Sequence, residues 1–261
     1  MKPTEINTLT FDVAGTLIDF ESGILNWFRP HLKELGIIRQ DEDILEAFAR
    51  TEAHYLKILP ESSFTEILPV LYSDMMRNWD HQPHEEDGIR FQNSVRDWPP
   101  FPDTVPALKE LKRHYRLSAV TNSDSHFLKY MAERMGNPFD DAFTCDHVGV
   151  NKPDKKVFHE VLLKLASKGI GRSEILHVAQ SQFHDIIPAA EIGLASAWIH
   201  RRHNKPGFGA TPEPYRMVEP SITATSMQDF TEQLLSKRKA GLRHRSGTFS
   251  LRVTFNQNEA A

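Results

Sequence analysis

Four groups of polar side chains that could do chemistry occur in order along the chain, each at the end of an expected strand or in the loop beyond it. They are Asp12 with Thr16, Thr121 with Asn122, Lys152, and Asp185. Polar groups just beyond the carboxyl ends of parallel strands meet at one edge of the sheet. A carboxylate there can act as a nucleophile, and a nearby lysine can keep it ionised at neutral pH. Taken singly, each residue also fits an ordinary turn or helix cap, so the hypothesis rests on their order.

Strands and helices must alternate if these residues are to meet. After a first strand that stops at Asp12, further strands are expected near 116–121, 142–145, 175–179, 195–200 and 221–224. Helical spacing of apolar residues fills the intervals, and a last helix is expected at 227–237. This alternation predicts an α/β fold with a doubly wound parallel sheet. The Pro- and Gly-rich residues 203–220 are expected to form a surface loop.

Residues 20–98 have helical spacing and no convincing strand, which predicts an all-helical domain inserted after the first strand. Pro69 lies within the third helical run, so that helix is either kinked or begins later than its pattern suggests. The proline-rich stretch 98–103 is expected to be a stiff, extended connector back to the main domain. The expected domains are a core of residues 1–19 and 99–236, the helical domain of residues 20–98, and a basic, flexible tail of residues 237–261.

The composition is that of a soluble globular protein with room for a real core: 261 residues, 39% hydrophobic and 25% charged. No apolar run is long enough to cross a bilayer, and the polar residues 1–5 do not resemble a secretory signal. The single cysteine, Cys145, excludes an intramolecular disulfide and favours a reducing, cytoplasmic setting. We expect Cys145 to be a small, half-buried strand residue rather than a nucleophile.

The net charge of −4 is distributed unevenly. Residues 237–261 contain six Lys and Arg against one Glu, a net charge of +5, so the remaining residues carry −9. An acidic body argues against nucleic acid as the main partner, and no membrane association is expected. The alternating apolar positions of residues 248–255 suit an added edge strand. Because neither nucleic acid nor a membrane is expected as a partner, we expect the partner to be a small-molecule substrate. The chain is expected to be a monomer or a homodimer.

The order and spacing of these motifs resemble those of the haloacid dehalogenase superfamily of aspartate-nucleophile hydrolases. In that superfamily the first motif is D-x-x-x-T, the second a Ser or Thr, the third a Lys and the fourth one or more acidic residues. The stretches most similar to its type II 2-haloacid dehalogenase branch are Phe11–Asp19, Val120–Asp124, Asn151–Asp154 and His177–Asp185. The resemblance covers about residues 6–236. It implies a Rossmann-like core, and it places the helical domain where the superfamily has its cap.

The resemblance implies a mechanism without a cofactor. Asp12 would displace halide from a carbon next to a carboxyl group, and water would then hydrolyse the ester. Lys152 would supply the counter-charge, Thr16 would fix the carboxylate, and Asp185 would orient Lys152 or the hydrolytic water. Because the substrate is an anion, the cap must also supply a cation, and Arg50 matches the family's cap arginine best. The implied substrate-binding residues are Val13, Ala14, Arg50, Thr121, Asn122 and Phe158.

Three positions depart from the family patterns. Ala14 stands where the phosphatases have a general acid and the dehalogenases a Tyr, and Phe158 stands where the branch usually has Tyr. Gln180 replaces an acid of the metal-dependent members, so Asp12 and Asp185 alone would bind Mg²⁺ weakly. Both Ala14 and Gln180 favour metal-free displacement at carbon.

Three alternatives stay open. The first is a Mg²⁺-dependent phosphatase of the same superfamily. The second is a phosphonoacetaldehyde hydrolase, which also has D-x-A-G-T but needs a cap lysine; Ala53 stands about where that lysine would fall, and Lys57 is only nearby. The third is a catalytically lapsed protein kept as a binding partner, to which Ala14, Gln180 and Phe158 give weight.

Overall fold

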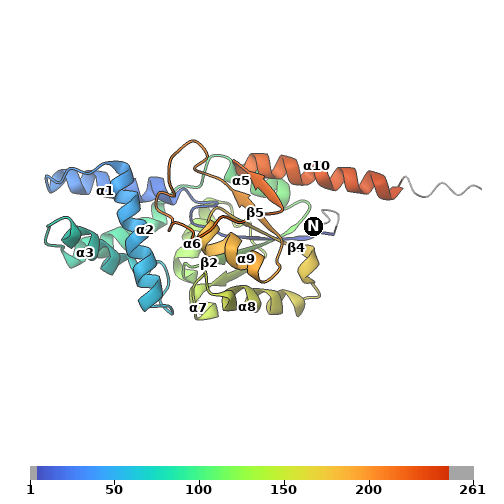
Figure 1. The fold of residues 1–261 in the computed structure, drawn as a ribbon, viewed down its shortest axis with the longest axis horizontal. Helices are drawn as coiled ribbons and strands as arrows, with labels where there is room; N and C mark the ends of the chain where they lie inside the picture. The colour runs from blue at the N-terminus through green and yellow to red at the C-terminus, as the bar shows by residue number, and fades with distance from the viewer. Residues whose placement is uncertain (1–4, 247–261) are drawn as a thin grey trace, which may run out of the picture.

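The centre of the molecule is a six-stranded, fully parallel β-sheet (Figure 1). The computed structural model describes residues 5–246. The strands run in the order β3-β2-β1-β4-β5-β6 across the sheet. Their bounds are β1 Thr8–Phe11, β2 Arg116–Thr121, β3 Asp141–Thr144, β4 Ile175–Ala179, β5 Ser196–Ile199 and β6 Ile222–Ala224. The doubly wound parallel sheet predicted from the alternating pattern is therefore confirmed.

Helices cover both faces of this sheet, because successive strand residues point to opposite sides. In β2, Ala119 belongs to one buried apolar cluster and Val120 to the other. The first cluster includes residues of α5 (Thr104–Leu111), α6 (Ser125–Arg134) and α10 (Met227–Ser246), and the second includes residues of α8 (Lys155–Ala166) and α9 (Ile187–Glu191). The short helices are α7 (Cys145–Val148), η2 (Arg172–Glu174) and the π-helix η3 (Gln182–Ile186).

A block of helices separates β1 from α5 in the chain and lies at one end of the sheet (Figure 1). It consists of α1 (Phe20–Glu34), α2 (Asp41–Ile58), α3 (Leu68–Asn78), α4 (Glu85–Ser94) and the short η1 (Val95–Asp97). Asp19 caps α1 by accepting a hydrogen bond from the backbone N–H of Ser22. Pro69 lies in the first turn of α3, so this helix begins late rather than bending. The boundaries between core, helical domain and tail remain predictions.

Three expectations need correction or fall outside the described residues. The last helix does not end at residue 237 but continues to Ser246, so residues 237–246 are helical rather than part of an irregular tail. Cys145 is buried, but it begins α7 instead of lying in a strand. The edge strand expected at residues 248–255 lies outside the described residues. Among residues 5–246, no helix is both long and apolar enough to cross a membrane.

Candidate active site

Asp12 directly follows β1, the strand at which the sheet order reverses. Phe11, the last residue of β1, pairs with Ala119 of β2 on one side and with Val178 of β4 on the other. The chain after Asp12 must therefore turn away between two neighbouring strand ends. Gly15 permits this turn with a φ of +94°, a conformation that side chains other than glycine rarely adopt. The topology thus places the Asp12 carboxylate at the switch point of the sheet.

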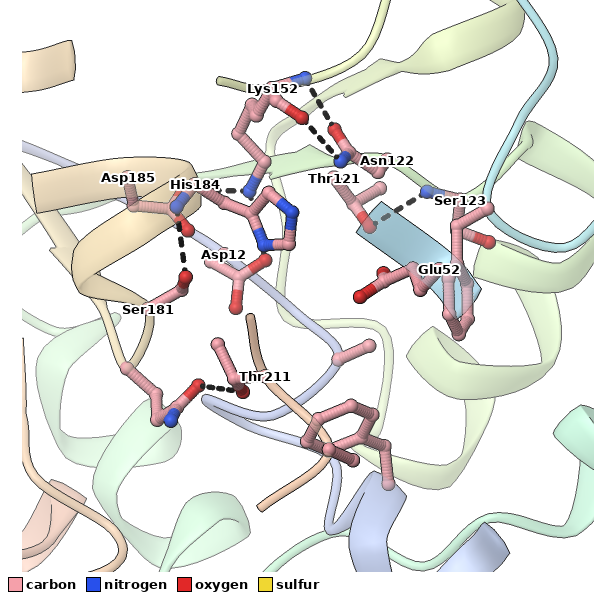
Figure 2. Close-up of a pocket in the computed structure, with 15 residues that line it drawn as sticks. Asp12, Glu52, Thr121, Asn122, Ser123, Lys152, Ser181, His184, Asp185 and Thr211 are labelled. Carbon is pink, nitrogen blue, oxygen red and sulfur yellow. Dashed lines mark hydrogen bonds and ion pairs between the residues drawn. The ribbon is translucent and has the colours of Figure 1, made fainter. Parts of the chain in front are cut away.

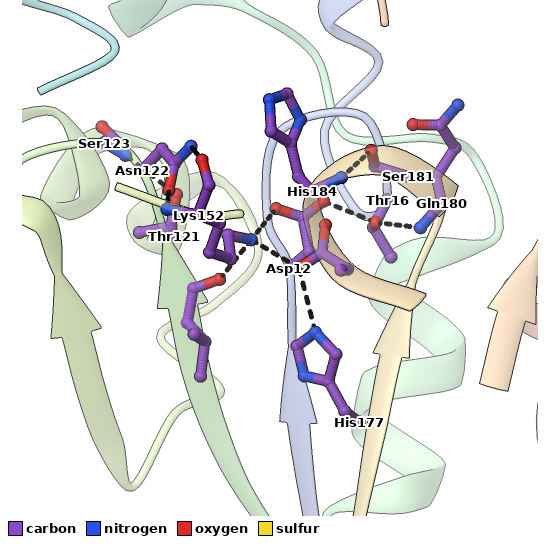
Figure 3. A network of polar contacts seen from close by, with 12 residues as sticks. Asp12, Thr16, Thr121, Asn122, Ser123, Lys152, His177, Gln180, Ser181 and His184 are labelled. Carbon is purple, nitrogen blue, oxygen red and sulfur yellow. Dashed lines mark hydrogen bonds and ion pairs between the residues drawn. The ribbon is translucent and has the colours of Figure 1, made fainter. Parts of the chain in front are cut away.

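Both carboxylate oxygens of Asp12 accept hydrogen bonds (Figure 3). The hydroxyl of Thr16 donates to Oδ2 at 2.6 Å, and Lys152 Nζ donates to Oδ1 at 2.9 Å. The Thr16 hydroxyl accepts in turn from the backbone N–H of Gln180 at 2.7 Å, so it is held in place and is not a helix cap. Burial raises the pKa of Asp12, and the Lys152 ammonium opposes that rise. The arrangement holds the carboxylate in one orientation.

Lys152 is 1% exposed, and its ammonium group makes three hydrogen bonds. They go to Asp12 Oδ1 at 2.9 Å, to Asp185 Oδ1 at 2.7 Å and to the carbonyl oxygen of Val120 at 3.0 Å. Burial by itself lowers the pKa of Lys152, but the two carboxylates raise it above its ordinary value. The side chain of Asn122 forms two hydrogen bonds with the backbone of Lys152, at 2.9 and 2.7 Å. The lysine is thus a charged, immobilised counter-ion of Asp12.

Asp185 comes from η3, which starts shortly after β4. Its Oδ1 also contacts His177 Nε2 at 3.0 Å, and His177 Nδ1 is 2.9 Å from the Thr10 hydroxyl. Burial acts to raise the pKa of Asp185, but Lys152 and His177 lower it to about 2. Asp185 is therefore ionised at neutral pH and orients Lys152, one of the two roles that the resemblance implied for it.

A small cavity of about 40 Å³ opens in front of Asp12 (Figure 2). The core domain contributes most of its lining, and the helical block contributes Phe20, Glu52 and Phe64. The core residues in the lining are Asp12, Ala14, Thr121, Asn122, Ser123, Lys152, Gln180, Ser181, His184, Asp185, Ala210 and Thr211. This volume holds a few water molecules and is well below the roughly 300–1,000 Å³ of an ordinary ligand pocket.

The structure brings most of the expected site residues together, but not all of them. Asp12, Thr16, Lys152 and Asp185 form one connected network, and Ala14, Thr121 and Asn122 line the cavity. The side-chain amide of Asn122, however, is hydrogen-bonded to the backbone of Lys152, so Asn122 positions the lysine. Two residues expected at the substrate do not reach the cavity. Val13 is buried in the core, and Phe158 packs edge-on against His177 with the ring centres 5.1 Å apart.

Arg50, the cation expected from the helical block, does not line the cavity either. Its side chain is 72% exposed, and its guanidinium lies 3.9 Å from Glu46. Glu52 lines the cavity instead and is 5% exposed. Positions 50 and 52 lie about 200° apart around a helix, so they face opposite sides. The sequence carried a signal for this, because Glu52 continues the spacing of the buried residues Leu45, Phe48 and Leu56.

Two further parts of the site could not be inferred from motif spacing. His184 is buried at the cavity, its Nε2 has no hydrogen-bond partner among the described residues, and burial lowers its pKa to about 4. The imidazole is therefore neutral at neutral pH. Residues 203–220, expected to be a surface loop, bring the buried Ala210 and Thr211 to the cavity. The Thr211 hydroxyl donates to Gln180 Oε1 at 3.1 Å.

Oxygen ligands for a divalent metal are few around Asp12. The described residues contain no group of three or more His, Cys, Asp and Glu side chains placed to hold a metal ion. Asp12 and Asp185 are the candidate carboxylates, and Lys152 already binds one oxygen of each. Asp185 Oδ2 is buried without a hydrogen-bond partner, and the Gln180 amide oxygen is occupied by Thr211. Mg²⁺ usually keeps several waters and binds through one or two carboxylates plus a substrate phosphate, so Asp12 and Asp185 would fit it together with such a substrate.

Comparison with known proteins identifies the family of this chain. Residues 6–193 match the family of haloacid dehalogenase-like hydrolases. The chain belongs to this family. The hydrolase is 29% identical over 140 residues to pyrimidine 5'-nucleotidase YjjG of Escherichia coli (strain K12), covering 53% of this chain and 57% of that protein. This hydrolase thus spans only about half the length of the curated relatives it matches.

Solved structures show that this hydrolase shares its fold with several proteins. A defluorinating L-2-haloacid dehalogenase matches with a TM-score of 0.74 and 20% identity, over 88% of this chain and 95% of that one. A putative HAD-hydrolase of Bacillus subtilis, bound to magnesium, matches with a TM-score of 0.68 and 18% identity, over 88% and 99% of the two chains. At these identities the likeness of the hydrolase to them is one of fold.

Proposed function

We propose that this hydrolase forms an ester between Asp12 and a small 2-substituted carboxylic acid, releases halide, and hydrolyses the ester without a divalent metal. The observation that carries the proposal is the immobilised Asp12 carboxylate, with Lys152 Nζ at 2.9 Å from Oδ1 and the Thr16 hydroxyl at 2.6 Å from Oδ2. This carboxylate borders a cavity in which residue 14 contributes only a methyl group. Displacement of halide needs no proton donor, so it suits a site with alanine there.

The reaction proceeds in two steps. A carboxylate oxygen of Asp12 attacks C2 of the substrate; a C–O bond forms, and the carbon–halogen bond breaks with its electron pair going to the halide. Water then attacks the Asp12 carbonyl carbon, and the bond from this carbon to the substrate oxygen breaks. The product is a 2-hydroxy acid that keeps an oxygen from Asp12, and Asp12 keeps the oxygen from water. The water loses one proton to the product oxygen and the other to solvent.

The charges at the cavity limit what can bind there. Lys152 is the one Lys or Arg among the described residues that line it, and its three N–H groups already bind Asp12, Asp185 and the Val120 carbonyl. The same observation weighs against phosphonoacetaldehyde hydrolysis, which needs a cap lysine for a Schiff base. Lys57, the nearest candidate, is exposed and does not line the cavity.

A direct test measures halide release from 2-chloro- and 2-bromopropionate in the presence of a chelator. We expect turnover by the wild type and a loss of about 10⁴-fold or more in Asp12→Asn, which removes the nucleophile. A single turnover in ¹⁸O-water, followed by mass spectrometry of the peptide that contains Asp12, is expected to place the label in its carboxylate. Absence of halide release from both compounds would contradict the proposal.

A second candidate function is a Mg²⁺-dependent phosphatase, favoured by the buried, unpartnered Asp185 Oδ2 and by the similarity to a pyrimidine 5'-nucleotidase. Asp12 and Asp185 would hold the ion, which would neutralise the charge of a substrate phosphate. Phosphate release from nucleoside monophosphates, measured with Mg²⁺ and with chelator, separates the two candidates. Turnover that requires Mg²⁺ and yields phosphate but no halide would favour the phosphatase.

A further inference from the structure

The helical block places one carboxyl group in the cavity of Asp12, that of Glu52 on α2 (Figure 2). The side chain is 5% exposed and points from α2 toward Asp12. No hydrogen bond or ion pair of Glu52 is present among the described residues, although other buried charged groups at the site are paired. A structural carboxylate would be expected to have donors around it, because burying an unpaired charge is costly.

The groups that face Glu52 do not favour its ionised form. Asp12 and Asp185 are acidic, and Lys152 already donates to both of them. His184, the other titratable group of the lining, is neutral at neutral pH. Burial, and then the charge of Asp12, raise the pKa of Glu52 to about 8, with Lys152 opposing. At neutral pH the carboxyl group is therefore mostly protonated and can donate a proton into the cavity.

The site has a use for such a proton. When the tetrahedral intermediate at Asp12 collapses, the departing group is an alkoxide, which is a poor leaving group without a proton. Residue 14, where phosphatases of the superfamily carry an acid, is alanine and cannot supply it. Asp185 cannot supply it either, because Lys152 and His177 hold it ionised. Among the described residues that line the cavity, Glu52 is thus the carboxyl group that can protonate the departing alkoxide.

We propose that Glu52 is a catalytic residue, the general acid that protonates the substrate oxygen as it leaves Asp12. The proposal rests on the proposed function. In phosphatases of the superfamily the general acid lies in the core, at the position of Ala14; here it would lie on α2 of the helical block. The bond between the Asp12 carbonyl carbon and the substrate oxygen breaks, its electron pair goes to that oxygen, and the Glu52 proton joins it. The attacking water returns one proton to Glu52 and releases the other to solvent, so the balance of the reaction is unchanged.

The test compares Glu52→Gln with the wild type and with Glu46→Gln, a control on the same helix whose side chain is 61% exposed. With 2-bromopropionate, Glu52→Gln is expected to release about one equivalent of halide and then stall, with steady-state turnover reduced about 10²- to 10⁴-fold. Mass spectrometry of the peptide that contains Asp12 is expected to show the accumulated ester. Glu52→Asp is expected to fall between the wild type and Glu52→Gln, and Glu46→Gln to behave as the wild type.

A second measurement needs no substrate. The infrared difference spectrum between the wild type and Glu52→Gln at neutral pH is expected to contain the carbonyl band of a protonated carboxylic acid. A spectrum that shows Glu52 ionised overturns the inference. The inference is also overturned if Glu52→Gln turns over at the wild-type rate and no ester accumulates on Asp12. If the wild type itself releases no halide, the proposed function fails, and the infrared band still decides the state of Glu52.

Discussion

Glu52 lines the cavity in front of Asp12, whereas Arg50, two residues earlier on α2, points to solvent. The two side chains lie about 200° apart around the helix, so only one of them can face the core. The helical block therefore offers an acid to the reacting centre rather than the cation that the family resemblance implied. This relationship sets the expected behaviour of variants at both positions.

Arg50→Ala is expected to leave kcat/KM for 2-bromopropionate within about twofold of the wild type, because an exposed ion pair contributes little. Its partner Glu46 lies 3.9 Å away, and both side chains are mostly exposed. Steady-state measurements of halide release by Arg50→Ala and by the wild type give the two kcat/KM values to compare. A rise in KM of tenfold or more would show that Arg50 reaches the substrate after all.

Lys152→Met is expected to lower the free energy of unfolding by about 3–5 kcal/mol, because it leaves Asp12 and Asp185 buried beside each other without their cation. Urea denaturation at neutral pH measures this loss. Lys155→Met is the matched control: it removes a half-exposed pair with Glu191, and we expect a change of about 0–1 kcal/mol. Equal losses in the two variants would contradict a buried, charged lysine.

Thr16→Val removes one hydrogen bond to Asp12 Oδ2 and leaves the backbone N–H of Gln180 without its acceptor. We expect a loss of about 1–3 kcal/mol in unfolding free energy, because a buried donor is left unsatisfied. Turnover is expected to fall as well, since the carboxylate is no longer held in one orientation. Thr16→Ser keeps the hydroxyl and is expected to retain most of both properties; a variant as damaged as Thr16→Val would point to the lost methyl group.

The contribution of Glu52 to the stability of the wild type is expected to fall as pH rises from about 4.5 to about 8, because the pKa of Glu52 is raised from 4.5 to about 8 in the folded protein. Within this window the folded state binds more protons than the unfolded state, so the contribution is complete below the lower value and lost above the upper one. Glu52→Gln does not titrate and lacks this decline, which is on the order of a few kcal/mol.

Urea denaturation of both proteins, below and above this window, measures the difference. The control is again Glu46→Gln, whose stability is expected to follow that of the wild type. If the wild type and Glu52→Gln lose the same stability with rising pH, Glu52 is ionised in the folded protein at neutral pH.

Much of the core could be predicted from the sequence because its signals are local. Short apolar runs, separated by segments with helical spacing, predicted the strands. The functional groups at the strand ends could also be predicted to meet, because parallel strands bring their carboxyl ends to one edge. The network of Asp12, Lys152 and Asp185 is the result.

The sequence by itself thus determined the parallel sheet, the strand end at Asp12, and the meeting of Thr16, Lys152 and Asp185 around its carboxylate. The apolar spacing of α2 indicates its buried face, but only the tertiary structure decided that this face meets the cavity of Asp12, with Glu52 rather than Arg50 in its lining. It also brought Thr211, from a stretch without motif or periodicity, against Gln180. The physical reason is that these placements depend on how distant segments pack against each other, whereas strand ends and turns depend on neighbours in the chain.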